Sequence, residues 1–424
     1  DPEIFMRVFC DVHDVLNQYS DFGLDDISSA MIARNNVTSQ GAIGEEALRR
    51  STRADRSRDP IYNQSKMYAE LFRTLGWIQS LPNARLRYAF SLLGIHMATA
   101  RNRAPLMREC LLGIAYPNEV LGVLSEQTVR VVGGILLAMD ALGSISRDEM
   151  MAGPMSIADD TNIKEFEAMI QRLAQCRKKP GTLDKWLNDI ATRRKITRHP
   201  TMENYTRIPI GMFAWSGWCT KSRGVLVITD DGKAMAARLR EAPDMRLSHF
   251  NALNDDTKPA FIRWTFYTML ERAGFNIEPV RDVINSSATI LDRHGLPHDG
   301  DVFFSPFQQL SSETIAKWTP ELIISTDNSQ SAESLIEGIN GSGPVVHERA
   351  TLIFELTGRA ATVPSGTDTI VDEIKTELKR TRSVSATADR LVEKYRNTNR
   401  DVFYPLVADL FCVIGFNCRL SRGG

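Results

Sequence analysis

The spacing of apolar residues predicts a helix, a short hairpin and a second helix over residues 204–241. Apolar side chains recur at 208, 212, 215 and 218, which is a helical period. Gly217 is a residue suited to ending the helix. The polar segment TKSRG predicts a turn, and the β-branched run VLVIT predicts a strand. Thr229 stands before two aspartates, which is typical of a capped helix start.

An earlier segment repeats this order of elements. The spacing Phe-x3-Gly-Trp occurs at 72–77 and again at 213–218, 141 residues later. Around the earlier occurrence, SKMYAELFRTLGW predicts a helix, LPNARLR a turn, YAF a strand, and Ser91 the cap of a further helix. We interpret the two segments as an internal repeat.

The repeated order of helix, strand, basic tip, strand and capped helix is that of a winged helix. In such a module one helix enters the DNA major groove and the tip touches the backbone. The tips carry Arg85 and Arg87 in the first copy, and Lys221 and Arg223 in the second. Winged helices also serve as protein–protein modules, so the pattern alone leaves both uses open.

Outside the repeat the pattern is mostly helical. Residues 127–153 predict a buried helix, a Gly-Ser turn and a second helix, and residues 163–179 predict an amphipathic helix with a basic end. A helix ending in Gly-Phe recurs at 266–276 and 409–420. Between 281 and 360, the turn-rich stretches HGLPHDGD, SPFQQLSSE and GINGSGPVV suggest linking segments.

The composition is that of an ordinary soluble protein, with 43% hydrophobic and 24% charged residues in a chain of 424. That length suffices for two or three domains. The longest apolar stretch, VVGGILLAM, is too short for a membrane span, and no secretory leader pattern is seen. Six cysteines lack any Cys-x2-Cys spacing, so we expect a reduced cytoplasmic protein without structural zinc or a membrane partner.

Positive charge gathers in local clusters, although the net charge of the chain is −1. A nucleic-acid role must therefore depend on those clusters. They occupy residues 49–58, 101–108, 176–180, 193–200 and 379–382. Each alone could be a solvated surface, but four lie within or beside the repeats, which favours double-stranded DNA as the partner.

Other chemistries have weaker support. HGLPHDGD brings two histidines and two aspartates together, but its glycines and proline indicate a loop rather than a metal site. GINGSGP lacks the Lys-Ser/Thr that completes a phosphate-binding loop. Aspartate pairs at 159–160, 230–231 and 255–256 are typical of helix starts rather than acid–base catalysis.

Several stretches, in collinear order, resemble the AlwI-like family of type IIS restriction and nicking endonucleases. The stretches are STR at 51–53, LLGIHMA, LLGIAYP at 111–117, VVGGILLAMDALGSISRDEM, EFEAMIQRLAQCRKK and YTRIPIGMFAWSGW, and the resemblance is strongest over 40–245. It implies an N-terminal winged-helix part that recognises an asymmetric DNA site. A linker and a C-terminal PD-(D/E)xK nuclease domain, which cuts at a fixed distance, would follow.

The same resemblance implies that residues 384–420 open the nuclease domain with a helix and its first strand. Glu393 stands at the place of the family's metal-site glutamate and is the candidate catalytic and metal-binding residue. We expect the other metal-site acids beyond Gly424. Mg²⁺ is the expected cofactor of the intact nuclease, because its chemistry needs converging carboxylates. No cofactor is expected for the recognition part.

We therefore expect a mainly α fold with small β-hairpins, comprising tandem winged-helix modules, a helical linker and the start of an α/β PD-(D/E)xK nuclease domain. The expected domains are a first winged-helix subdomain (1–105), a helical insert with the second winged-helix subdomain (106–245), a helical linker (246–360) and the opening of the nuclease domain (361–424). The expected function is sequence-specific recognition of double-stranded DNA within a restriction or nicking endonuclease. A second copy or a small nuclease subunit could cut the second strand. The alternative is a winged-helix regulator or interaction scaffold without nuclease activity.

The candidate DNA-binding residues are basic or polar and lie on the predicted recognition helices, tips and clusters. They are Arg53, Arg56, Arg58, Lys66, Arg85, Arg87, Arg193, Arg194, Lys195, Arg198, Asn204, Tyr205, Thr206, Arg207, Lys221 and Arg223. At the start of the first recognition helix, residues 63–66 are expected to be exposed, as are residues 204–207 in the second. Arg207 is the best single candidate, because a guanidinium can grip guanine O6 and N7 together. The alternative for Arg207 is a phosphate contact.

Overall fold

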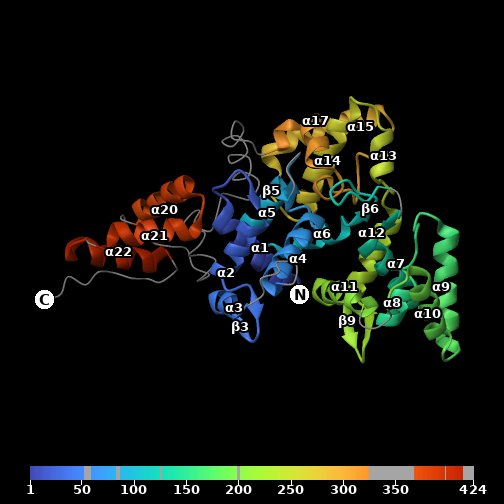
Figure 1. Cartoon of the computed structure of the whole chain (residues 1–424). Coiled ribbons are helices and arrows are strands. Elements are labelled where there is room, and N and C mark those ends of the chain that lie inside the picture. The colour runs from blue at the N-terminus through green and yellow to red at the C-terminus, as the bar shows by residue number, and fades with distance from the viewer. Residues whose placement is uncertain are drawn as a thin grey trace.

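The computed structural model of the chain describes residues 1–51, 59–82, 86–124, 127–197, 201–323, 367–396 and 398–413. These residues form a mainly helical protein with small antiparallel sheets, as the sequence predicts (Figure 1). None of the helices that they form is both long and apolar enough to cross a membrane.

The first unit surrounds a three-stranded antiparallel sheet of order β1-β5-β4. The strand β1 is only two residues long and pairs Phe22 with Tyr88. In chain order the unit contains α1 (Pro2–Leu16), β1 (Phe22–Gly23), α2 (Leu24–Ala33), β2 (Thr38–Ser39), β3 (Ala42–Ile43), α3 (Gly44–Arg50), α4 (Pro60–Thr74), β4 (Ile78–Ser80), β5 (Arg87–Phe90) and α5 (Leu92–Thr99).

The second unit has the same sheet order, β8-β10-β9, and the same alternation of helices and strands around it. Its elements are α7 (Val131–Leu142), β8 (Ser144–Ser146), α8 (Arg147–Ala152), α9 (Ile163–Lys178), α10 (Thr182–Arg194), α11 (Glu203–Ser216), β9 (Cys219–Ser222), β10 (Val225–Ile228) and α12 (Asp230–Glu241). The internal repeat seen in the sequence is thus a structural duplication. The units are joined through α6 (Ala104–Leu112), β6 (Ala115–Tyr116) and β7 (Val129–Arg130).

The Gly-Trp pair of each copy ends a helix and starts the sheet. Gly76 and Gly217 have φ of +74° and +84°, a left-handed conformation that glycine adopts without strain. The tryptophan that follows turns inward, so Trp77 is 0% and Trp218 3% exposed. The repeated spacing therefore reflects one way of turning the chain from a helix into the first strand of a hairpin, with a buried tryptophan at the corner.

The residue that caps the next helix closes the same corner in both units. The side-chain oxygens of Ser91 and Thr229 accept hydrogen bonds from the N–H groups of Gly94 (2.9 Å) and Gly232 (3.1 Å). Both hydroxyls donate to the carbonyl of the glycine that ends the preceding helix. A Cβ on Gly94 or Gly232 would lie 2.0 or 2.1 Å from a tryptophan carbonyl oxygen, so only glycine fits there. The predicted caps at both positions are confirmed.

A third helical region packs against both units. It contains α13 (Leu247–Ala252), α14 (Thr257–Arg272), η3 (Glu278–Val280), α15 (Arg281–Arg293), α16 (Pro306–Gln309), α17 (Ser312–Trp318) and η4 (Pro320–Leu322). One continuous core runs from the first unit through the second and into this region. The helix ending in Gly-Phe that the sequence predicts at 266–276 agrees with α14, which ends at Arg272 and is followed by further helices as far as Leu322.

The linking role that the turn-rich pattern suggested for SPFQQLSSE is wrong. Phe304 and Phe307 are almost fully buried, at 1% and 0% exposure. The Gln308 side chain donates hydrogen bonds to the carbonyls of Thr74 (3.1 Å) and Cys110 (2.8 Å). The stretch is part of the core because Phe307, Gln308 and Gln309, together with Phe304 just before it, fill the space behind the first unit.

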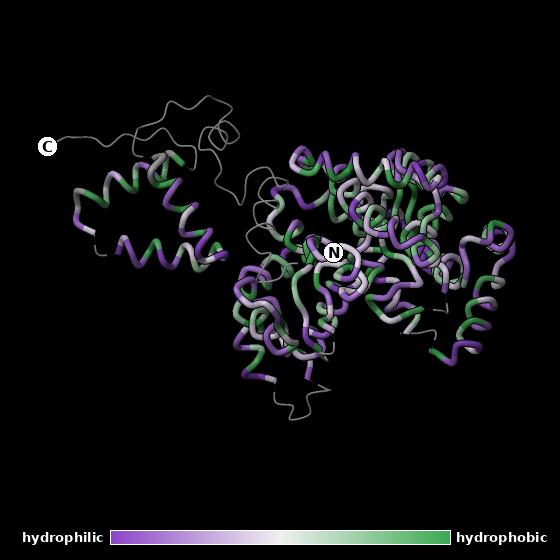
Figure 2. The backbone as a smooth tube through the Cα atoms, turned by 90° about the horizontal axis from the view of Figure 1, so that it is seen from above, coloured by the Kyte–Doolittle hydropathy of each residue, from purple (hydrophilic) through white to green (hydrophobic). Residues whose placement is uncertain are grey.

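Three further helices, α20 (Thr367–Thr381), α21 (Val384–Tyr395) and α22 (Arg400–Val413), lie beside the body of the protein in both views (Figures 1 and 2). They meet it at α1, where Asp14 accepts hydrogen bonds from the Ser383 hydroxyl (3.2 Å) and the Val384 N–H (3.0 Å). The predicted opening helix of 384–420 is present as α21. The predicted first strand extends into residues outside the described part, and Leu410 to Val413, within α22, are helical.

Candidate nucleic-acid interface

The first turns of α11 present a mixed polar and basic surface. Asn204, Tyr205 and Arg207 are exposed, Tyr205 to 61%. Thr206, predicted to be exposed, is instead 0% exposed, and its hydroxyl donates to the carbonyl of Glu203 (2.7 Å). The helical period turns Thr206 toward the core while its two neighbours face solvent. Three of the four predicted positions are therefore available to a ligand.

The first turns of α4 expose fewer of the predicted polar and basic side chains than those of α11. Asn63 and Lys66 are exposed, but Ser65 is 0% exposed and donates to the carbonyl of Ile61 (3.1 Å), so its predicted exposure is wrong. Gln64 is half-buried and exchanges two hydrogen bonds with the backbone of Thr38 in β2, at 2.6 and 3.1 Å. Ser65 occupies the position of Thr206 in the repeat, 141 residues earlier, and both are inward for the same reason.

The hairpin β9–β10 projects from the second unit (Figure 1). Its two-residue turn is formed by Arg223, with φ +46°, and Gly224, with φ +87°. Two positive φ angles suit the twist of a tight antiparallel hairpin. Lys221 and Arg223 are exposed, and within the described residues neither side chain makes an ion pair. Both predicted tip residues therefore present exposed positive charge.

An arginine on the hairpin of the first unit, at the strand position of Val225 in the second, is already paired. Arg87 on β5 makes ion pairs with Asp21 and, through Nη1 at 3.6 Å, with Asp26. Sequence patterns did not indicate this pairing, because the two aspartates lie more than 60 residues earlier in the chain. Arg85, the other predicted tip residue of the first unit, lies outside the described residues.

A basic corner precedes α11. Arg193, Arg194 and Lys195 at the end of α10 are all exposed, and Lys195 ends that helix with φ +53°. The Thr197 and Thr201 hydroxyls then share a hydrogen bond of 2.7 Å. This bond draws the end of α10 toward the start of α11. Lys185, exposed on α10, adds a cation that the charge clusters did not single out.

Besides Arg85, four predicted DNA-binding residues lie outside the described part of the chain: Arg53, Arg56, Arg58 and Arg198.

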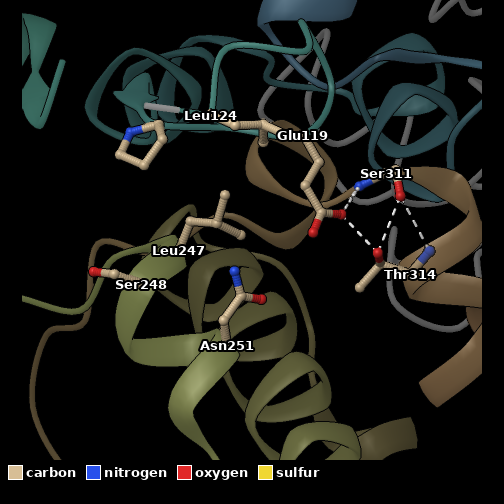
Figure 3. A pocket seen from close by; sticks show the side chains of 8 residues that line it. Glu119, Leu124, Leu247, Ser248, Asn251, Ser311 and Thr314 are labelled. Atoms are coloured by element: carbon tan, nitrogen blue, oxygen red, sulfur yellow. Dashed lines mark hydrogen bonds between the residues drawn. The ribbon is translucent and has the colours of Figure 1, made fainter. Parts of the chain in front are cut away.

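A cleft of about 550 Å³ is lined by Pro117, Glu119, Leu124, Leu247, Ser248, Asn251, Ser311 and Thr314. Figure 3 shows the Glu119 carboxylate turned toward the start of α17. It accepts hydrogen bonds from the Ser311 N–H (2.9 Å) and the Thr314 hydroxyl (2.6 Å). The carboxylate thus holds α17 in place, which is a structural role.

Metal-ligating side chains do not converge in the described part of the chain, where no group of three or more His, Cys, Asp or Glu could hold an ion. Glu393 is exposed on α21, 3.9 Å from the Arg396 guanidinium. In HGLPHDGD the acidic and basic groups turn to different partners, His294 to Asp256 (3.3 Å) and Asp301 to Arg238 (2.7 Å). The described residues therefore do not fit a magnesium site, and Glu393 remains a lone candidate.

No protein-family model matches the chain, and comparison with curated proteins finds no significant match.

Proposed function

We propose that this chain recognises a specific sequence in double-stranded DNA, as the recognition part of a type IIS restriction or nicking endonuclease. The observation that carries the proposal is the duplicated three-stranded sheet with its preceding helix and protruding hairpin. In each unit a short first strand pairs with the second strand of the hairpin. That order is the one expected of a winged helix, and the duplication suits tandem winged-helix modules.

The second unit offers the chemistry that DNA recognition needs. As the recognition helix, α11 would enter the major groove with Asn204 and Arg207 toward base edges. Arginine and asparagine make paired hydrogen bonds with guanine and adenine respectively. The hairpin would place Lys221 and Arg223, which are exposed and have no ion-pair partner among the described residues, against phosphates, where their charges would release counterions.

The endonuclease part of the proposal is supported by the resemblance to AlwI-like enzymes. Cutting would require a nuclease domain with a divalent metal, Mg²⁺ in that family. Because the described residues lack converging metal ligands, we assign no step of hydrolysis to them. A second copy of the chain or a small nuclease subunit remains the proposed partner for second-strand cleavage, and we propose a cytoplasmic location.

Fluorescence anisotropy with labelled duplex and single-stranded DNA tests the proposal. We expect duplex binding whose logarithmic affinity falls linearly with the logarithm of salt concentration, with a slope that reports several phosphate contacts. Single strands of the same sequence should bind more weakly. Absence of duplex binding at low salt would contradict the proposal and favour an interaction scaffold without DNA.

A further inference from the structure

We infer that the two units have divided roles: the second contacts DNA, and the first is a platform, because several of its corresponding polar and charged side chains are already bonded within the protein. The inference rests on the proposed function and sharpens it. The sequence assigned the two copies equal roles, so this division follows only from side-chain contacts. Three differences between the two units support it.

The first difference is the accessibility of the helix that precedes the hairpin. In the first unit, the hairpin β2–β3 lies against α4, and Thr38 holds Gln64 with two hydrogen bonds. Those bonds tie down a side chain that a DNA-reading helix would have to offer. At the equivalent position in the second unit, Tyr205 is 61% exposed.

The second difference is the partner of the capping-box carboxylate at the start of α2 in the first unit and of α8 in the second. In the first unit this acid is Asp26, which accepts from the Gly23 N–H (2.7 Å) and pairs with Arg87 of the hairpin strand. In the second it is Glu149, which accepts from the Ser146 N–H (2.8 Å). Its partner is Arg177 of α9 (2.6 Å).

That exchange of partners has a consequence for the hairpins. In the second unit the inserted helix α9 supplies this cation, and Val225 stands at the strand position of Arg87. The hairpin cations Lys221 and Arg223 make no ion pair among the described residues. In the first unit the hairpin arginine is held by Asp21 and Asp26 instead. An ion-paired guanidinium would have to lose a carboxylate partner before it could gain a phosphate, so its net contribution to DNA binding is small.

The third difference lies in the basic corner between α10 and α11. Its counterpart in the first unit is the end of α3, where Arg49 and Arg50 already pair with Glu46, at 3.5 and 2.9 Å. Arg194 and Lys195 are exposed and, among the described side chains, unpaired. The Thr197–Thr201 hydrogen bond brings this corner toward the helix that carries Arg207. Phosphate-binding and base-reading groups thereby occur on consecutive elements of one unit.

The platform role of the first unit is visible in its contact with α11. The Trp215 indole N–H donates to the Glu3 carboxylate of α1 at 2.6 Å, and α1 packs beside α11. The first unit thus supports the end of α11 remote from Asn204 and Arg207. Support from behind fixes the direction in which the first turns of α11 project.

Matched double substitutions test the division of roles in the full chain. Lys221→Ala/Arg223→Ala removes two charges from the second unit, and Lys66→Ala/Arg87→Ala removes two from the first. Binding to duplex DNA is measured by anisotropy across a salt series. We expect the second-unit variant to bind about tenfold more weakly, with the salt slope reduced by about two, and the first-unit variant to change by less than about twofold.

A third variant is a control for loss of binding caused by misfolding of the first unit. Asp21→Asn frees Arg87 from one carboxylate without removing any cation, so we expect equal or slightly tighter binding. Circular dichroism and thermal unfolding check that each variant is folded. Equal losses in the two double variants would overturn the division of roles and leave DNA binding standing. Failure of the wild-type chain to bind duplex DNA would instead overturn the proposed function itself.

Discussion

Arg207 is the best single candidate for a residue that reads a base. It is exposed in the first turns of α11, one residue beyond the buried Thr206 and beside the exposed Asn204 and Tyr205. Nothing in the described part of the chain pairs with its guanidinium. A side chain placed in this way can reach a base edge or a neighbouring phosphate.

Arg207→Ala should therefore relax the preference at one base position, with a loss of about 1–3 kcal/mol of discrimination there. Affinity for non-specific duplex should change little, because few phosphate contacts are lost. Competition assays against single-base variants of a preferred site provide the measurement. A uniform loss on every sequence would make Arg207 a phosphate contact and move base reading to other residues.

Arg177 is the residue that attaches the inserted helix α9 to the second unit. Its guanidinium donates to Glu149 and to the carbonyls of Leu142 (3.0 Å) and Ser144 (2.6 Å). Burial alone would raise the pKa of Glu149, but the bonds from Arg177 and from Ser146 hold that pKa below its ordinary value of 4.5. The ion pair therefore stabilises the fold only while Arg177 and Glu149 are both charged.

We expect Arg177→Ala to lower the free energy of unfolding by about 2 kcal/mol at pH 7, less than for a fully buried pair because Arg177 is partly exposed. Since the folded pKa of Glu149 is depressed, its stabilisation is present above pH 4.5 and is lost as the pH falls through the folded value. Denaturant titrations of both proteins across this range should show their difference shrinking on acidification. A difference independent of pH would rule out this role for the carboxylate.

Among the elements, the corner between helix, hairpin and capped helix is the most closely repeated. In both copies a glycine one turn into the capped helix lies against the tryptophan carbonyl that starts the sheet. The tight approach lets the capped helix cross directly behind the hairpin. The position of the hairpin relative to α11 therefore depends on that glycine.

Gly232→Ala should destabilise the protein by at least about 2 kcal/mol, because the new methyl group meets backbone that cannot move aside. Gly94→Ala should behave alike in the first unit. Gly211→Ala is the matched control: its Cβ has room, at 3.7 Å from the nearest atom, and alanine favours a helix. Chemical denaturation of the three variants would contradict the account if all were equally stable.

At this scale the sequence predicted more than at any other. Periodicity and capping residues correctly indicated α4, α11, α7, the strand β10 and the caps at Ser91 and Thr229. The short strand that precedes each hairpin, β1 or β8, was not predicted, because two or three residues cannot show an alternating pattern. Such strands form only because the neighbouring hairpin supplies their hydrogen-bonding partners.

The candidate site was less predictable than the elements. The basic residues of the second hairpin and of α10 are exposed as predicted, but residue type alone could not show that Ser65 and Thr206 face inward. Nor could it show that Arg87 is paired with acids distant in sequence. Exposure and pairing depend on tertiary neighbours, which no local pattern records.

At the scale of the molecule, both units and the helices that follow them share one core. Residues 303–310 fill the space behind the first unit, and α1 supports α11 of the second. A shared core holds the second hairpin and α11 in a fixed relation to the rest of the body. This rigidity suits the proposed task of positioning a cutting domain at a set distance from a recognised site.

Recognition of a specific duplex sequence by this chain is tested most directly by selection from a pool of random double-stranded DNA. The full chain is used to retain bound duplexes through several rounds, and the enriched sequences are read. We predict enrichment of one short asymmetric motif, with Arg207→Ala losing preference at one position of it. Retention of DNA without any enriched sequence, or no retention at all, would contradict the claim.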